Sequence, residues 1–107
     1  MFHSKIKNVT AAEAHKLISE DNEFVILDVR TREEYDDGHI AGAKLVPVSN
    51  LNMQLDELDK YKDKPVLVYC ASGGRSPRAV DTLANSSFKN IYHLNRGICS
   101  WAYSLTR

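Results

Sequence analysis

The sequence lacks long apolar runs, an excess of either charge, and the cysteine content of a disulfide-bonded domain. Its 107 residues include 14 basic and 14 acidic side chains, so the formal net charge is zero. Nucleic-acid-binding domains usually carry a basic excess, and this balance argues against that class. No apolar run approaches the ~20 residues of a membrane-spanning helix. Residues 1–10 have no hydrophobic segment of the signal-peptide type, which predicts a cytoplasmic location.

The two cysteines, Cys70 and Cys99, are too few for a disulfide framework. A reducing cytoplasm keeps such thiols free, so each is either a small buried apolar side chain or a reactive group. His3, His15 and His93 lack paired ligand spacing with either cysteine. We therefore expect no metal site.

The length predicts a single domain over residues 1–107. General scaling relations give a folded surface of about 6,000 Å², with about two thirds of the surface of the unfolded chain buried. Hydrophobic residues make up 43% of the sequence, and this content argues against disorder. A core of this size needs no disulfide or metal to fold.

Segments with strand character alternate with segments of helix character. Continuous apolar runs with β-branched residues are typical of strands buried on both faces. The predicted strands are residues 24–29, 44–48, 65–69 and 90–94. The predicted helices begin at the capping boxes of Thr10 and Thr31, at the N-caps Ser49 and Ser76, and after Gly97, where a short helix carries Trp101. This alternation predicts an α/β fold with a parallel sheet covered by helices.

The residues after the predicted strand 65–69 form the candidate site. Cys70 is followed by a loop with two adjacent glycines, Gly73 and Gly74, and then by Arg75 and Ser76. In open parallel sheets, ligands bind beyond the carboxyl ends of the strands. Glycine-rich loops present backbone N–H groups to anions, and the following helix adds its positive end. A thiol in such a cradle has a lowered pKa and is partly thiolate at neutral pH.

A purely structural role for these residues is the alternative. Buried cysteines are common, and paired glycines often do no more than make a tight turn. For Cys70 taken alone, we favour that interpretation. The thiol, the glycines, Arg75 and the helix start at Ser76 together favour a reactive cysteine instead.

Several short motifs occur in a characteristic order along the chain. They are Asp28-Val29-Arg30, Glu34, His39-Ile40-Ala41-Gly42-Ala43, Pro47, Cys70-x-x-Gly73-x-Arg75-Ser76 and Leu94-x-x-Gly97-x-x-x-Trp101. Each motif is weak alone, but the ordered set closely resembles the single-domain rhodaneses, a family of sulfurtransferases. The resemblance extends from about Val9 to Trp101, which is nearly the whole chain.

The resemblance implies a single rhodanese-like domain whose five-stranded parallel sheet is flanked by helices on both faces. It implies that Cys70 takes a sulfane sulfur from a donor such as thiosulfate and passes the resulting persulfide sulfur to cyanide or a thiol. No cofactor is implied. The residues expected to bind the sulfur anion are Ala71, Ser72, Gly73, Gly74, Arg75 and Ser76, with Arg75 as the charged contact. The residues expected to support the site structurally are Asp28, Arg30, Glu34 and His39.

Loop length separates sulfur transfer from phosphatase activity. Phosphatases with a similar cradle have five residues between the cysteine and the arginine, whereas the four residues Ala71 to Gly74 separate Cys70 from Arg75. The shorter loop suits a single sulfur atom better than a tetrahedral phosphate. We therefore rank phosphatase activity well below sulfur transfer.

Departures from the family pattern leave several alternatives open. Ala71 and Ser72 stand where some strongly thiosulfate-active members carry basic residues, so thiosulfate, a polysulfide, a small persulfide and a protein persulfide all remain candidate donors. Arg96, in place of a frequent glycine, is either a cation at the pocket rim or a solvated loop residue. Cys99 is either a resolving thiol or a packed small side chain, and we favour the packed side chain.

A different class of function is also compatible with these residues. The domain could be an interaction module that receives or delivers sulfur only through a protein partner, with little turnover of small donors. The presence of Cys70 and of the complete loop argues against a purely structural module. Neither nucleic acid nor a membrane is expected as a partner.

Overall fold

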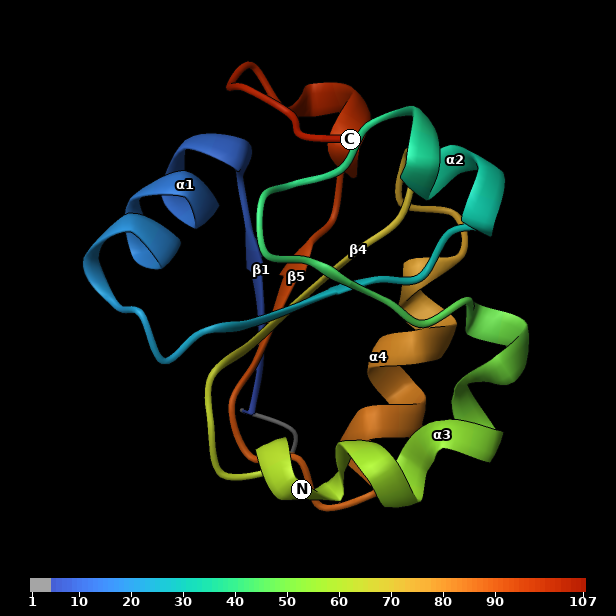
Figure 1. Ribbon diagram of the computed structural model, residues 1–107. Helices are drawn as coiled ribbons and strands as arrows, with labels where there is room; N and C mark the ends of the chain where they lie inside the picture. Colours follow the sequence, from blue (N-terminus) through green and yellow to red (C-terminus); the bar gives the residue numbers. More distant parts are fainter. Residues whose placement is uncertain (1–4) are drawn as a thin grey trace.

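A sheet of five parallel strands forms the centre of the molecule (Figure 1). The computed structural model describes residues 5–107, so the prediction about His3 lies outside the described residues. The strands are β1 (Ile6–Val9), β2 (Val25–Asp28), β3 (Lys44–Leu45), β4 (Val66–Tyr69) and β5 (Ile91–Leu94). Their order across the sheet is β1-β5-β4-β2-β3, which places β4 in the middle. The predicted parallel α/β architecture is confirmed.

β1 is the strand that the residue patterns did not predict. It is four residues long, and two polar side chains lie between its two apolar ones. β1 pairs with β5, where Ile6 lies opposite Ile91 and Asn8 lies opposite His93. The strand forms because β5 offers a free edge to it, and local sequence does not contain that information.

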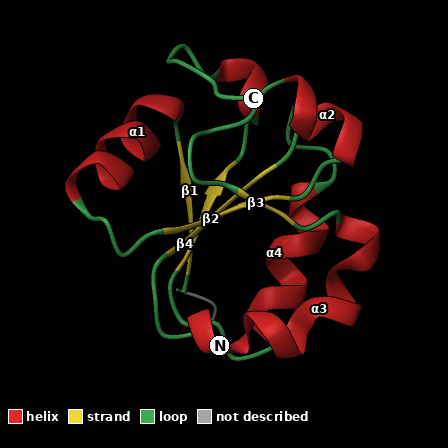
Figure 2. Ribbon diagram, viewed as in Figure 1, coloured by secondary structure: helices red, strands yellow, loops and turns green. Residues whose placement is uncertain are grey.

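Within residues 5–107, four α-helices surround the sheet. They are α1 (Ala11–Glu20), α2 (Arg32–Asp37), α3 (Leu51–Leu58) and α4 (Ser76–Asn85). The capping boxes predicted at Thr10 and Thr31 are both formed, which fixes the starts of α1 and α2. Figure 2 shows α1 on one side of the sheet and α3 and α4 on the other, so helices cover both faces.

The starts of α3 and α4 differ from the predictions. Ser49 lies inside a short 3-10 turn, Val48–Asn50, and α3 begins only after this turn. Ser76 is the first residue of α4, and Arg75 occupies the cap position. The Ser76 hydroxyl does not cap the helix because it lies against Cys70 instead.

The element that follows Gly97 is a 3-10 turn, Ile98–Ser100, and not an α-helix. Trp101 comes after this turn with extended backbone, so the predicted short helix carrying Trp101 is wrong. A further 3-10 turn, Asp59–Tyr61, follows α3. The Trp101 side chain packs against the core cluster on the α1 side of the sheet.

β4 contributes to the core on both faces of the sheet. Val66 and Val68 belong to the cluster under α3 and α4, whereas Leu67 and Tyr69 belong to the cluster on the α1 side. All four side chains are fully buried. The accessible surface of 6139 Å² agrees with the value of about 6,000 Å² expected from the chain length.

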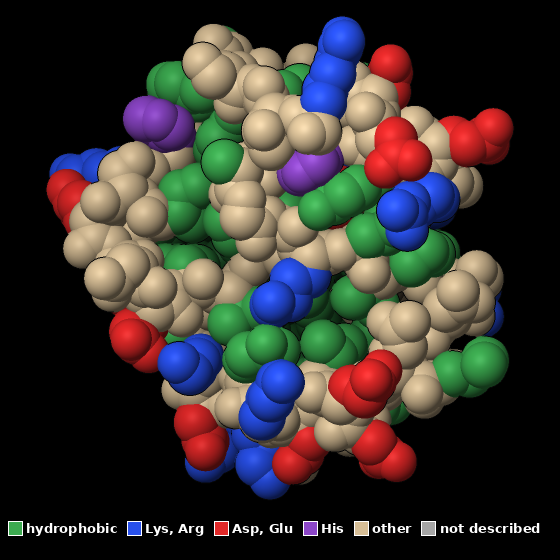
Figure 3. All heavy atoms as spheres, viewed as in Figure 1, with side chains coloured by type: hydrophobic (Ala, Val, Ile, Leu, Met, Phe, Trp, Pro, Cys, Tyr) green, Lys and Arg blue, Asp and Glu red, His purple; other side chains and the backbone are tan. Residues whose placement is uncertain are grey.

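Charged side chains of both signs are interspersed on the face of the molecule shown in Figure 3. An example of a surface ion pair joins Lys64 to Glu23 across 2.8 Å. Among residues 5–107, no helix is both long enough and apolar enough to cross a membrane.

Candidate active site

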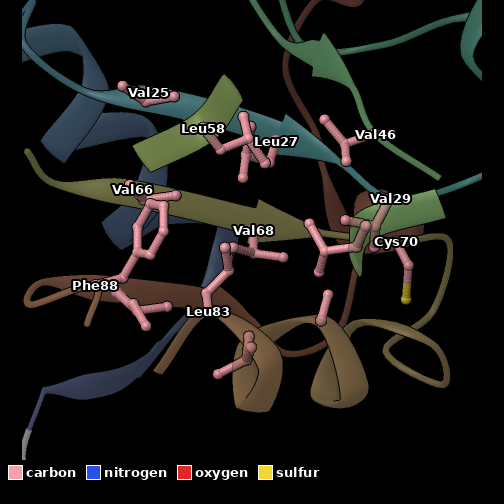
Figure 4. Close-up of a cluster of buried hydrophobic side chains, with 14 residues drawn as sticks. Val25, Leu27, Val29, Val46, Leu58, Val66, Val68, Cys70, Leu83 and Phe88 are labelled. Atoms are coloured by element: carbon pink, nitrogen blue, oxygen red, sulfur yellow. The ribbon is translucent and has the colours of Figure 1, made fainter. Parts of the chain in front are cut away.

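Cys70 follows the last residue of β4 and therefore lies at the carboxyl end of the central strand (Figure 4). Its side chain is fully buried and belongs to the core cluster under α4. The backbone N–H groups of Gly73 and Ser76 donate to Sγ at 3.2 and 3.4 Å, and Oγ of Ser76 lies 3.3 Å from Sγ. The loop from Cys70 to Ser76 thus wraps around one sulfur atom.

Two opposing effects act on the pKa of the Cys70 thiol. Burial raises this pKa, because a thiolate loses hydration in the protein interior. Hydrogen bonds from the Ser76 side chain and from the backbone N–H groups of Arg75, Ser76 and Gly73 lower it and outweigh burial. The pKa of Cys70 is therefore below its ordinary value, in the direction predicted from the sequence, and the thiol is more readily ionised.

Gly73 and Gly97 allow the cysteine loop and the turn after β5 to approach closely. Gly73 has a φ of +97°, and a Cβ at this position would collide with the carbonyl oxygen of Asn95. Gly97 has a φ of +70°, and a Cβ there would collide with the carbonyl group of Ala71. Both backbone conformations also disfavour residues with a side chain. The two glycines therefore fix the shape of the loop around Cys70.

Backbone hydrogen bonds complete this contact. The N–H of Ile98 donates to the carbonyl of Cys70, and the N–H of Cys99 donates to the carbonyl of Ala71, both at 2.9 Å. Cys99 itself is exposed, so the interpretation of it as a packed small side chain is wrong. A role as a resolving thiol stays a prediction. Arg96 is exposed as well, which agrees with a solvated loop residue.

Arg75 lies at the end of the cysteine loop and connects it to α2. Its two terminal nitrogens donate to the two carboxylate oxygens of Glu34 at 2.8 and 2.9 Å. The Arg75 guanidinium lowers the pKa of Glu34 to about 2. The same carboxylate accepts from the N–H of Thr31 in the capping box of α2. The charge of Arg75 is thus paired within the protein, and a direct contact with a donor anion stays a prediction.

Asp28 and Arg30 form a buried ion pair at the carboxyl end of β2. A terminal nitrogen of Arg30 donates to Asp28 and to the carbonyl of Gly38, both at 2.7 Å. The Tyr69 hydroxyl donates to the same carboxylate at 2.7 Å and accepts from the N–H of Ile40 at 3.1 Å. This network joins the end of β4 to the segment before β3. Its geometry fits the supporting role predicted for Asp28 and Arg30.

His39 holds the segment that precedes β3. Its Nδ1–H donates to the carbonyl of Tyr35 at 2.8 Å, and its ring stacks on the Tyr35 ring with centroids 3.7 Å apart. The backbone of His39 also exchanges two hydrogen bonds of 2.8 Å with Thr106. These contacts fit a supporting role and pair Thr106 with the segment that follows α2.

His93 is a site residue that sequence reasoning missed. Its Nε2 lies 2.6 Å from Oγ of Ser76, and its Nδ1 lies 3.1 Å from Oδ1 of Asn8. The ring is buried, and burial lowers the pKa of His93. The sequence pointed to no partner for this histidine, because Asn8 reaches it only through the pairing of β1 with β5.

The assembled site is suited to stabilising negative charge on a single sulfur atom. Its donors are backbone and hydroxyl groups fixed by the loop, and they converge on Sγ of Cys70. Among residues 5–107, no group of three or more His, Cys, Asp or Glu side chains is placed to hold a metal ion.

Comparison with protein families matches residues 10–104 to the family described as Rhodanese-like domain. The chain belongs to this family. The match extends over both the Cys70 loop and the turn at Gly97. The resemblance predicted from the ordered motifs is therefore confirmed.

Relatives of this rhodanese-like domain differ in size. The uncharacterized protein YibN of Escherichia coli (strain K12) is 36% identical over 100 residues, which cover 92% of this chain and 69% of YibN. A tRNA uridine(34) hydroxylase of Erwinia tasmaniensis is 33% identical over 96 residues, or 86% of this chain and 27% of that protein. A thiosulfate sulfurtransferase from Pseudomonas aeruginosa has a similar structure, with a TM-score of 0.82, 29% identity, and coverage of 95% of this chain and 20% of that chain. The chain thus corresponds to only a part of the hydroxylase and of the thiosulfate sulfurtransferase.

Proposed function

We propose that this rhodanese-like domain is a sulfurtransferase in which Cys70 is the nucleophile and carries the transferred sulfur as a persulfide. The observation that carries this proposal is the convergence of two backbone N–H groups and the Ser76 hydroxyl on Sγ of Cys70. Donors fixed in this way stabilise a thiolate at Sγ, which is the form that attacks a sulfur donor. Family membership supports the same class of reaction.

The proposed reaction has two steps. In the first step, the Cys70 thiolate attacks the outer sulfur of thiosulfate or a comparable donor. A new S–S bond forms at Sγ, the S–S bond of the donor breaks, and sulfite leaves with the electron pair. In the second step, cyanide or a thiolate attacks the terminal sulfur, and the Cys70 thiolate is released. The reaction is balanced without a cofactor.

Access to the sulfur limits the size of the donor. Cys70 is fully buried, whereas Ser72 and Gly74 are exposed on the outer side of the loop. The loop encloses Sγ, and a small anion requires a smaller opening to reach it than a protein does. We therefore propose small sulfane-sulfur anions as donors, and cyanide or thiols as acceptors.

The remaining predicted residues act by holding the loop and the strand ends. Glu34 fixes Arg75, and Asp28 with Arg30 fixes the segment before β3. Cys70 and Cys99 are both free thiols, which suits a reducing compartment such as the cytoplasm.

The proposal is tested by measuring thiocyanate formation from thiosulfate and cyanide. We expect turnover by the wild-type protein and by Cys99→Ser, and none by Cys70→Ser. Cys99→Ser is the matched control because it removes the exposed thiol and leaves the buried one. Equal turnover in Cys70→Ser and the wild type would contradict the assignment of Cys70 as the nucleophile.

The second candidate function is a sulfur carrier that works only with a protein partner. The full burial of Cys70 is also compatible with this candidate, since a partner can hold the loop open. A persulfide that forms on Cys70 without turnover of thiosulfate and cyanide would support the carrier over the enzyme. A phosphatase fits the site less well, because the guanidinium that would bind phosphate is paired with Glu34.

A further inference from the structure

His93 is a buried titratable residue that the two sulfur-transfer steps do not use. It lies in β5 and is 6% exposed. Its Nε2 lies 2.6 Å from Oγ of Ser76, and its Nδ1 lies 3.1 Å from Oδ1 of Asn8. Oγ of Ser76 in turn lies 3.3 Å from Sγ of Cys70. A continuous chain of polar groups therefore connects the nucleophile to the edge strand β1.

When Cys70 is a thiol, every hydrogen bond in this chain is satisfied with a neutral His93. Oδ1 of Asn8 can only accept, so the proton of the neutral ring lies on Nδ1. Nε2 then accepts the hydroxyl proton of Ser76, and Oγ of Ser76 accepts the S–H of Cys70. The three bonds all point from Cys70 toward Asn8.

When Cys70 is a thiolate, the arrangement must change. The Ser76 hydroxyl has one proton, which it now donates to Sγ. Its oxygen then presents a lone pair to Nε2 at 2.6 Å, and the contact is repulsive unless Nε2 is protonated. An imidazolium donates from Nε2 to Ser76 and from Nδ1 to Asn8, and all contacts are satisfied again. Ionisation of Cys70 to the thiolate is therefore coupled to protonation of the His93 ring.

We propose that Cys70 and His93 share one proton through the Ser76 hydroxyl, and that His93 is a positioning residue that favours the thiolate. As the Sγ–H bond breaks, an Oγ–H bond forms, and the original Oγ–H bond is replaced by an Nε2–H bond. Nothing is oxidised or reduced. Burial lowers the pKa of His93 and opposes its charged form, whereas the nearby thiolate favours it. The inference rests on the proposed function, because it concerns how the nucleophile is prepared.

The surroundings of His93 supply a suitable control. A cavity of about 370 Å³ lies beside the ring, between β1, the cysteine loop, α4 and β5. Among the described residues that line it, Asp81 of α4 is the ionisable residue besides His93. Arg75, which precedes Ser76, is paired with Glu34. Replacing Asp81 therefore removes the charge that faces this cavity without breaking the chain from Cys70 to Asn8.

The first test is a titration of the Cys70 thiolate by ultraviolet absorbance, in a Cys99→Ser background where Cys70 is the remaining thiol. We expect His93→Phe to raise the midpoint by about one pH unit, which means about tenfold less thiolate at pH values well below both midpoints. Asn8→Asp lowers the midpoint, because a carboxylate stabilises the imidazolium. Asp81→Asn is expected to raise the midpoint by much less than His93→Phe does, because Asp81 is exposed and solvent screens its charge. An unchanged or lower midpoint in folded His93→Phe would overturn the proposal.

The second test is the reciprocal titration of the His93 ring by nuclear magnetic resonance. Two coupled groups shift each other by the same amount, so Cys70→Ser is expected to lower the midpoint of His93 by about one pH unit as well. Identical His93 midpoints in the wild type and Cys70→Ser would overturn the proposal even if His93→Phe does not fold. Neither titration uses a sulfur donor, so failure of this inference is distinguishable from failure of sulfur transfer.

Discussion

The adjacent glycines of the cysteine loop have different structural roles at the residue scale. Gly73 has a positive φ and leaves no room for a Cβ beside the carbonyl of Asn95. A Cβ at Gly74 would meet no heavy atom within 4 Å, and the φ of Gly74 is not positive. Gly73 therefore holds the N–H that donates to Cys70, whereas Gly74 accepts a side chain.

Replacing each glycine by alanine tests this difference. We expect Gly73→Ala to destabilise the protein by about 1–3 kcal/mol and to reduce turnover, because the loop must move away from the carbonyl of Asn95 and its N–H then shifts relative to Cys70. Gly74→Ala is expected to be neutral or stabilising by less than about 1 kcal/mol, since it reduces the entropy of the unfolded chain. Thermal unfolding and thiocyanate formation report both effects. Equal losses in the two variants would contradict the assigned roles.

Local sequence predicted some site residues and not others for a physical reason. Cys70, Gly73 and Ser76 lie within seven consecutive positions, so their chemistry can be read from the chain itself. Tyr69 enters the site through Asp28 and Ile40, which are 41 and 29 residues away. His93 enters it through Ser76 and Asn8, which are 17 and 85 residues away. Such contacts depend on the order and register of the strands, which the sequence does not state.

The buried ion pair of Asp28 and Arg30 belongs to the scale of elements, because it joins β2, β4 and the segment before β3. Asp28 is 0% exposed, and Arg30 is 6% exposed. Asp28→Ala leaves a buried guanidinium without its partner, and we expect a loss of about 3–5 kcal/mol in the free energy of unfolding. Urea denaturation measures this loss.

An exposed ion pair provides the control for that measurement. Lys64 and Glu23 lie 2.8 Å apart with side chains 43% and 62% exposed. Glu23→Ala is expected to cost less than about 1 kcal/mol, because solvent screens the pair. A loss in Asp28→Ala no larger than the loss in Glu23→Ala would show that the buried network does not hold these elements together.

The contact between Glu34 and Arg75 joins α2 to the cysteine loop and predicts a pH dependence of stability. The pKa of Glu34 is lowered in the folded protein from its ordinary value of 4.5 to about 2. The folded state thus binds fewer protons than the unfolded state between these values. The stabilisation is fully present above about pH 4.5 and is lost as the pH falls toward about 2.

Glu34→Gln tests this pH dependence, because glutamine does not ionise. Its free energy of unfolding is expected to fall less than that of the wild type between about pH 5 and about pH 2. Both side chains are about a third exposed, so the difference at neutral pH is less than about 1 kcal/mol. Urea unfolding at stepwise pH measures both curves. Curves that stay parallel throughout this range would contradict the role of the pair.

The structure also changes the expectation for Arg75. The resemblance to rhodaneses implied that Arg75 is the charged contact for the sulfur anion. Glu34 reaches the loop from α2 and pairs with that charge. No local pattern predicts this contact, because Glu34 and Arg75 are 41 positions apart.

At the scale of the whole molecule, the alternation of strands and helices was sufficient to predict the parallel sheet and the position of Cys70 at its carboxyl edge. The strand β1 was not predicted from its residues, since its short and half-polar sequence becomes a strand only beside β5. This omission also hid Asn8 and its contact with His93. The contacts of His93 with the edge strand are therefore among the parts of the site that the sequence misses, as are the contacts of Tyr69 and Glu34 across other elements.

The central claim is that Cys70 carries the transferred sulfur, and intact mass measurement after incubation with thiosulfate tests it most directly. The account predicts a gain of one sulfur atom in the wild type and in Cys99→Ser, no gain in Cys70→Ser, and loss of the added sulfur when cyanide is supplied. Peptide mapping is expected to locate the sulfur on Cys70. A sulfur that is found on Cys99, or that persists in Cys70→Ser, would contradict the account.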